Sequence, residues 1–290
     1  MNPVLLTADD ARAIRKLEPG IHHLQLSCTS VTVKVDSKGI EIGGQILPVS
    51  ELDGAKRTNV FYIPVDGCLT EARIFTDHFY KLVPTGGFPA LEIDGVRMHR
   101  SKDMFPEEEA KLKVDLLEPV PGQQVLDICT GLGYCAQELA LRGCLVLSLE
   151  KSPEVVELAR MNPCSQPFFE YLRSTRISLV LCDAARFVSL LPSGYFDRVI
   201  HDPPTFSLAG ELYSLSFYTD LRRVLKPDGL LLHYTGQPGS RYRRLSLKRG
   251  VSERLRQAGF ATRWEARSRS VIARPIKRAL RRAEAGGEKR

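Results

Sequence analysis

Two patterns of hydrophobic and polar positions divide the chain near residue 105. Within residues 21–50, apolar and polar side chains alternate, and Asp36-Ser-Lys-Gly39 and Gly43-Gly44 interrupt the alternation. Alternation places every second side chain on one face of a strand, so this region predicts small antiparallel hairpins. Residues 59–65 and 90–100 predict further strands. We therefore expect residues 1–104 to form a β-rich α+β domain.

After residue 105, short apolar runs alternate with helical patterns. The strand-like runs are residues 123–129, 144–150, 177–183, 196–202 and 229–236. The helical patterns are residues 106–120, 133–143, 152–162, 184–191, 212–225 and 250–259. Such alternation predicts an α/β fold with a Rossmann-like, doubly wound sheet. We expect this domain to span residues 105–276, with 260–269 and 270–275 as a closing hairpin and 277–290 as a basic tail.

Composition limits the class of protein. Hydrophobic residues make up 43% of the 290, which suits a buried core. No apolar run approaches the roughly 18 residues of a membrane span, and the first residues lack the pattern of a signal peptide. The seven cysteines include no Cys-x-x-Cys pair. That argues against a zinc ribbon or disulfide framework and suits the cytoplasm.

The positive charge is concentrated at the C-terminal end. The net charge is +7, yet residues 238–290 hold 17 Lys and Arg against 4 Asp and Glu. Concentrated positive charge attracts phosphate backbones. An RNA partner is therefore one interpretation, and a solvated basic tail is the other.

The most informative segment is Val125-Leu-Asp-Ile-Cys-Thr-Gly-Leu-Gly-Tyr-Cys-Ala136. It joins an apolar strand to a helix through Gly-x-Gly-x-x-Ala, a spacing that lets a ligand approach the backbone closely. Asp127 lies four residues before Gly131, where a carboxylate would repel a pyrophosphate. It could instead accept hydrogen bonds from a cationic amino-acid group.

The segment 125–133 resembles motif I of class I S-adenosylmethionine (SAM)-dependent methyltransferases. Two acids follow at strand ends. Glu150, 23 residues after Asp127, would accept both ribose hydroxyls, and Asp183 with the backbone of Ala184 would read the adenine. The resemblance implies SAM as cofactor. The residues implied to contact it are Asp127, Thr130, Gly131, Gly133, Tyr134, Glu150, Lys151, Asp183, Ala184 and Asp202.

Asp202-Pro203-Pro204 follows the fourth strand and resembles the Asp-Pro-Pro-aromatic motif of amine methyltransferases. The lone pair of an exocyclic amine is delocalised into its ring. A carboxylate and a backbone carbonyl that accept its two hydrogens would direct the lone pair toward the methyl group. The resemblance implies Asp202, Pro203 and Pro204 as catalytic residues. Thr205 departs from the motif because an aromatic is expected there, and Phe206, or Tyr213, is the candidate substitute.

The continuation through Ser214, with residues 80–84 and 98–103, resembles a group of methyltransferases found mainly in archaea. That group implies N-methylation of a base in RNA, with rRNA or tRNA as the acceptor. Two alternatives stay open. One is an aminopropyltransferase that uses decarboxylated SAM, and the other is a non-catalytic RNA-binding subunit with the same fold.

The remaining candidates are weaker. His99, Arg100 and Lys102 would grip a phosphate or the SAM carboxylate, or else form an exposed basic turn. His22 and His23 point to opposite faces of a strand, so no metal site is expected. His233 is expected to be structural, and Cys129 and Cys135 to pack the cofactor loop. No membrane partner is expected.

Overall fold

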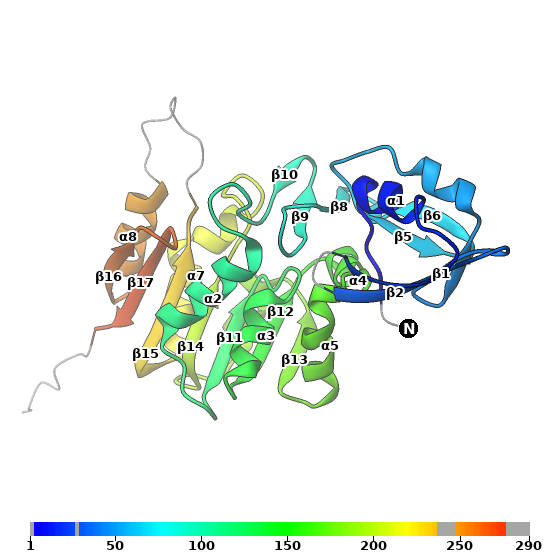
Figure 1. Ribbon diagram of the computed structural model, residues 1–290. Coiled ribbons are helices and arrows are strands. Elements are labelled where there is room, and N and C mark those ends of the chain that lie inside the picture. The colour runs from blue at the N-terminus through cyan, green and yellow to red at the C-terminus, as the bar shows by residue number, and fades with distance from the viewer. Residues whose placement is uncertain (1–2, 27–28, 237–246, 277–290) are drawn as a thin grey trace, which may run out of the picture.

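The computed structural model describes residues 3–26, 29–236 and 247–276 (Figure 1). Its N-terminal unit starts with α1 (Ala8–Ile14). Thr7 begins this helix because its hydroxyl accepts a hydrogen bond from Asp10 N, while the Asp10 carboxylate accepts one from Thr7 N. Four strands follow as an antiparallel sheet in chain order. They are β1 (Gly20–Leu26), β2 (Thr29–Asp36), β3 (Gly39–Ile42) and β4 (Gln45–Leu47).

A 3₁₀ turn, η1 (Val49–Gly54), and a hairpin of β5 (Tyr62–Val65) and β6 (Cys68–Glu71) complete this unit. Alternate side chains of its strands pack inward, among them Val33, Ile40 and Leu47. The expected hairpins of residues 21–50 are confirmed. Helix α1 was not anticipated from the sequence.

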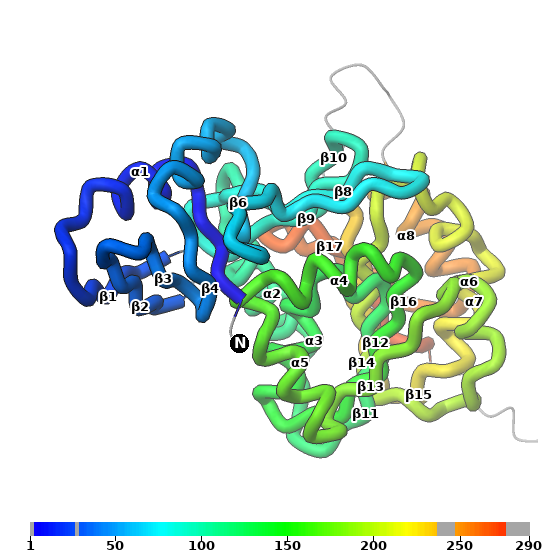
Figure 2. The backbone as a smooth tube through the Cα atoms, turned by 90° about the vertical axis from the view of Figure 1, so that its right-hand side faces the viewer, coloured from blue at the N-terminus to red at the C-terminus, as the bar shows by residue number. Residues whose placement is uncertain are grey.

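A second small sheet connects this unit to the rest of the molecule (Figures 1 and 2). Its strands are β7 (Arg73–Phe75), β8 (Phe79–Val83), β9 (Ala90–Ile93) and β10 (Val96–Arg97). Tyr80, Leu82 and Leu91 share one hydrophobic core with helices of the following domain. The expected boundary at residue 104 therefore falls just before a helix, but residues 73–97 pack with the domain that follows.

The central sheet has seven strands in the order β13-β12-β11-β14-β15-β17-β16. The first five are parallel, and the last two form an antiparallel hairpin. Their bounds are β11 (Gln124–Ile128), β12 (Leu145–Glu150), β13 (Ile177–Leu181), β14 (Phe196–His201), β15 (Leu225–Tyr234), β16 (Phe260–Glu265) and β17 (Ser270–Pro275). The doubly wound sheet and its closing hairpin are confirmed.

Helices cover both faces of this sheet, as two separate hydrophobic cores show. One face carries α2 (Pro106–Leu117), α3 (Tyr134–Leu141), α4 (Pro153–Met161) and α5 (Gln166–Arg173). The other carries α6 (Ala184–Phe187), α7 (Leu215–Val224) and α8 (Leu247–Gln257). Short 3₁₀ turns lie between them at η2 (Pro163–Ser165), η3 (Val188–Leu190) and η4 (Gly210–Tyr213).

Helix α5 was missed because Pro163 and Pro167 flank its start. Pro167 lies in the first helical turn, where a missing N–H breaks no intrahelical bond. The prolines therefore begin a helix here and do not prevent one.

The strand order sets the position of the site. Strand β11 lies between β12 and β14, so the chain winds outward in opposite directions from β11. In open α/β sheets a ligand crevice forms outside the carboxyl ends of the strands at such a reversal. The ends of β11, β12, β13 and β14 all face this crevice.

Two further observations concern the described residues as a group. No helix among them is long and apolar enough to cross a membrane. Five cysteines are free thiols, whereas Cys164 is disulfide-bonded. The sequence argued against a disulfide framework, and one bonded cysteine beside five free thiols is not such a framework.

Candidate active site

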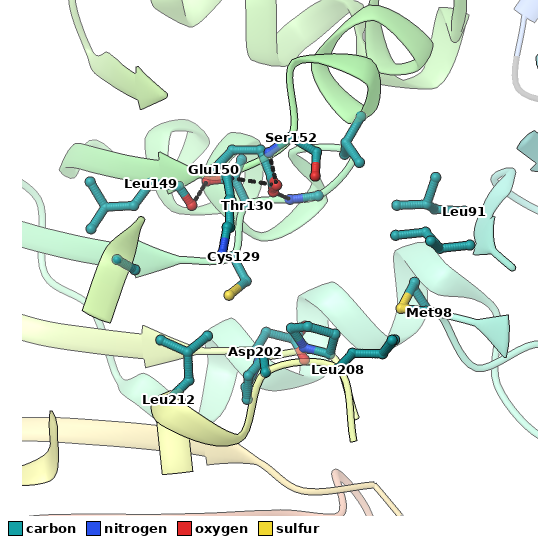
Figure 3. Close-up of a pocket in the computed structure, with 18 of the residues that line it drawn as sticks. Leu91, Met98, Cys129, Thr130, Leu149, Glu150, Ser152, Asp202, Leu208 and Leu212 are labelled. Atoms are coloured by element: carbon teal, nitrogen blue, oxygen red, sulfur yellow. Dashed lines mark hydrogen bonds between the residues drawn. The ribbon is translucent and has the colours of Figure 1, made fainter. Parts of the chain in front are cut away.

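A cavity of about 530 Å³ lies at the carboxyl ends of the central strands (Figure 3). The loop after β11, the ends of β12, β13 and β14, and helix α2 form its walls. The turn between β7 and β8 lines it as well, and Thr76 Oγ1 donates to Glu154 Oε1 at 3.0 Å across its edge. The cavity thus collects segments that lie more than 100 residues apart in the sequence.

The glycine loop shapes one wall. Gly131 and Gly133 have φ angles of +59° and +82°, the left-handed region that favours glycine. A Cβ built on Gly131 would meet no atom within 4 Å, and Gly131 lines the cavity. The loop therefore leaves open space beside its backbone, as a closely bound cofactor requires.

Glu150 is held at the centre of this wall. Its carboxylate accepts hydrogen bonds from Gly131 N at 2.9 Å, Lys151 N at 2.8 Å and Ser152 N at 3.0 Å (Figure 3). Burial raises the pKa of Glu150, and these backbone groups oppose the rise. The residue lines the cavity, as expected for a carboxylate that receives ribose hydroxyls.

Asp183 and Ala184 lie at the next strand end. The Asp183 carboxylate caps α6 by accepting from Ala185 N at 3.0 Å, and Lys151 Nζ lies 3.1 Å from it. Burial by itself would raise the pKa of Asp183, but the hydrogen bond and charge of Lys151 outweigh it, so the pKa is lowered. Lys151, Asp183 and Ala184 line the cavity together with Glu150. The structure therefore brings these expected cofactor residues to one place.

Asp127 lies beneath the loop and is not among the residues that line the cavity. It is 1% exposed, and its Oδ2 accepts from Thr130 Oγ1 and Ser148 Oγ, both at 2.9 Å. Thr130 does line the cavity. The carboxylate therefore supports the loop from below, and direct contact with the cofactor stays a prediction.

Tyr134 lines the cavity, and its hydroxyl has partners within the protein. It donates to Pro89 O at 2.8 Å and accepts from Asn162 Nδ2 at 2.7 Å. The side chain thus connects the β8–β9 loop to the catalytic domain. Contact between Tyr134 and the cofactor, which the resemblance implies, stays a prediction.

Asp202 enters the same cavity from the end of β14. Its Oδ2 accepts from Lys113 Nζ on α2 at 2.6 Å, and Glu109 Oε1 lies 3.6 Å from the same nitrogen. Lys113 also lies 4.0 Å from the centre of the Tyr234 ring. The sequence did not point to Lys113 or Glu109, because α2 reads as an ordinary charged helix.

Hydrogen bonding and stacking fix the Pro203-Pro204 turn. Tyr213 is 2% exposed and donates to Pro204 O at 2.8 Å. Phe206 is 52% exposed and packs edge-on against Tyr213, with ring centres 5.5 Å apart. Tyr213 is thus a support for the turn, which rules it out as the exposed stacking ring. Phe206 does not line the cofactor cavity and opens onto a neighbouring one.

Of the remaining candidates, Arg100 and His233 have structural partners, whereas the exposed Lys102 forms no ion pair among the described residues. Arg100 pairs with Asp103 and donates to Arg267 O at 2.8 Å. His233 Nε2 lies 2.8 Å from the Tyr218 hydroxyl, and burial lowers the pKa of His233. Burial raises the pKa of the Cys129 and Cys135 thiols. Among the described residues, no group of three His, Cys, Asp or Glu side chains could hold a metal ion.

Comparisons with known proteins give the family. Residues 126–233 match the model of a methyltransferase domain. An uncharacterized protein of Methanocaldococcus jannaschii, MJ1233, is 46% identical over 206 residues, which are 71% of this chain and 70% of that one. Putrescine N-methyltransferase 1 of Nicotiana tabacum is 31% identical over 147 residues, which are 49% of this chain and only 38% of that enzyme.

The fold is also that of a solved spermidine synthase in complex with the transition-state analogue AdoDATO. The TM-score is 0.53 at 19% identity, over 71% of this chain and 73% of that one. The matched domain, the glycine loop with its open space, and Glu150 and Asp183 on the cavity wall all fit SAM. The chain belongs to the same family as the Methanocaldococcus protein, and its catalytic domain is that of a class I SAM-dependent methyltransferase.

Proposed function

We propose that this protein N-methylates an exocyclic amine of a base in RNA, with rRNA or tRNA as the acceptor. One observation carries the proposal. Asp202 and the rigid Pro203-Pro204 turn line the cofactor cavity, and the same two prolines line a second, basic cavity beside it. An acceptor in the second cavity would reach the cofactor across this turn.

The chain's part in the reaction would be to orient the amine. SAM, when bound, supplies an electrophilic methyl group. Lys113 holds Oδ2 of Asp202, and no described residue donates to Oδ1. Oδ1 would accept one N–H of the amine and take the proton that the nitrogen loses, and the Pro203 carbonyl would accept the other N–H. Such fixed acceptors act by positioning and electrostatics.

A comparison of RNA nucleosides tests the proposal. Mass spectrometry of nucleosides from a deletion strain should show the loss of one N-methylated base. Wild-type protein should restore it, and Asp202→Ala should reduce it by about 100-fold, as for a lost electrostatic contact at a reacting atom. Asp228→Ala, an exposed acid on β15, is the matched control. If every methylated nucleoside persists in the deletion strain, the proposal fails.

Aminopropyl transfer is the second candidate, because the spermidine synthase shares the fold and acidic side chains at Asp77, Glu154 and Glu211 line the cofactor cavity. Isothermal titration of the protein with SAM and, separately, with decarboxylated SAM distinguishes methyl transfer from aminopropyl transfer. The proposed function requires tighter binding of SAM. Tighter binding of the decarboxylated form would favour aminopropyl transfer.

The third candidate is a non-catalytic RNA-binding subunit. In that case Asp202→Ala would restore the modified nucleoside as fully as the wild-type protein does.

A further inference from the structure

A second cavity of about 1460 Å³ adjoins the cofactor cavity. Four residues line both: Met98, His99, Pro203 and Pro204. Small-molecule sites usually enclose about 300–1,000 Å³. The cofactor cavity falls in that range, whereas the second cavity exceeds it and therefore suits a larger acceptor.

The second cavity, here called the basic cleft, carries a strong positive charge. Its cationic side chains are Arg97, Arg100, Lys102, Arg249, Arg254 and Arg269, and its carboxylates are Asp103 and Glu253. Both carboxylates are already paired. Asp103 lies 2.6 Å from Arg100 and 2.7 Å from Arg269, and Glu253 lies 2.9 Å from Arg249. The excess of cations favours an anionic ligand and disfavours a free polyamine.

The cations of the cleft that form no ion pair among the described residues come from two parts of the chain. Arg97 and Lys102, after β9, are exposed and form no ion pair among the described residues. Arg254, on α8, has a buried Nε with no hydrogen-bond acceptor in the described part of the chain. The Pro203–Phe206 turn lines the same cleft. Positive side chains thus come from two segments about 150 residues apart.

An exposed aromatic ring completes the arrangement. Phe206 lines the basic cleft and is 52% exposed, and the buried ring of Tyr213 packs edge-on against it. A half-exposed ring within a cationic groove is how proteins hold single-stranded nucleic acid, since bases stack on the ring and phosphates contact the cations. The ring lies four residues after Asp202.

We propose that the basic cleft binds an unpaired segment of RNA, with the target base against Phe206 and neighbouring phosphates on Arg97, Lys102 and Arg254. The inference rests on the proposed function and adds where and in what form the acceptor binds. An amine engaged in a base pair cannot reach a carboxylate within a cavity, so the target base must be single-stranded or turned out of its duplex. The volume and positive charge of the cleft suit a flanking strand.

Fluorescence anisotropy with a labelled, mixed-sequence 15-nucleotide RNA tests the inference on the full chain. Arg97→Ala/Lys102→Ala should weaken binding by about tenfold or more. It should also reduce the slope of log K against log salt by about 1.4, since each phosphate contact to a single strand contributes about 0.7. Phe206→Ala should weaken binding with an unchanged slope, because stacking releases no counterions.

Lys111→Ala/Arg173→Ala, two exposed cations outside both cavities, is the matched control and should bind as the wild type does. An unchanged melting temperature and SAM affinity would show that the cleft variants are folded.

Equal binding by the cleft variant and the wild type would overturn the inference, even where the nucleoside comparison supports RNA methylation. If the same RNA sequence binds equally well or more tightly as a duplex, the inference that the cleft binds unpaired RNA is wrong. If a single strand of DNA binds more tightly than the RNA, the inference that the ligand is RNA is wrong. If the wild type binds no RNA and no nucleoside changes, the proposed function itself fails.

Discussion

Asp202 and Glu109 share one buried cation, Lys113. The side chain of Lys113 is 4% exposed, which makes its charge costly unless it is paired. Burial opposes the charge, yet Asp202 and then Glu109 raise the pKa of Lys113. Lys113 is therefore a positioning residue that fixes one oxygen of Asp202 and leaves the other free.

Removing this cation should destabilise the protein. Lys113→Met leaves Glu109 buried without its counter-charge, and breaking a buried ion pair in this way costs about 3–5 kcal/mol. We expect urea unfolding to show a loss of about 3 kcal/mol, with Lys113→Arg recovering part of it. Lys111→Met, on an exposed position of the same helix, should change stability by less than about 0.5 kcal/mol. Equal losses from the two Met variants would refute the role of Lys113.

At the scale of elements, the turn from β11 into α3 divides its two glycines between different tasks. Gly131 leaves open space toward the cavity. Gly133 caps α3, and a Cβ placed there would lie 2.6 Å from Phe168 Cγ on α5. One glycine thus serves the ligand and the other serves helix packing.

The two alanine variants should therefore differ. Gly131→Ala should cost about 1 kcal/mol of stability for its positive φ and weaken SAM binding at least tenfold. Gly133→Ala adds overpacking against Phe168 and should cost about 3 kcal/mol. Denaturant unfolding and SAM titration on both variants check this. A larger stability loss from Gly131→Ala would contradict it.

Asp127, beneath the same turn, should make stability depend on pH. Burial raises its pKa to about 7, against the hydrogen bonds from Ser148 and Thr130. An unfolded Asp has a pKa near 3.9, so between about pH 4 and 7 the folded state holds a proton that the unfolded state has lost. The stability that this proton provides is full below pH 4 and is lost as the pH rises through about 7.

Asp127→Asn removes that titration. From pH 4 to pH 8, the free energy of unfolding of the wild type should fall relative to that of the variant by roughly 4 kcal/mol. Urea unfolding across this range provides the measurement, and the difference between the two proteins cancels other titrating groups. Parallel curves would show that the Asp127 pKa is not raised.

On the scale of the whole molecule, the small sheet of β7–β10 joins the N-terminal unit to the catalytic domain. Tyr80, Leu82 and Leu91 enter the catalytic core, and Tyr134 bonds to Pro89 O. The β7–β8 turn also bonds to α4 through Thr76 and Glu154. The segment of β7–β10 therefore forms part of the cofactor cavity wall.

Tyr134→Phe should test this connection. It leaves the Pro89 carbonyl without its donor, which costs about 1–3 kcal/mol for a buried group. Thermal or urea unfolding should show this loss, while SAM affinity should stay within about twofold because the ring remains. Tyr195→Phe, at a 46% exposed position, is the control. A large loss of SAM affinity without a loss of stability would instead make the hydroxyl a cofactor contact.

Apart from helix α5, the sequence by itself determined the order and type of the central elements, because buried parallel strands and amphipathic helices have local hydrophobic patterns. It also placed Glu150, Asp183 and Asp202 at strand ends, and parallel strands bring their carboxyl ends to one edge. Only the tertiary structure decided which side chains face the cavity. It turned Asp127 beneath the loop, tied the Tyr134 hydroxyl to Pro89, and set Lys113 against Asp202 from 89 residues away. Such contacts depend on how separate elements pack, and no local pattern encodes them.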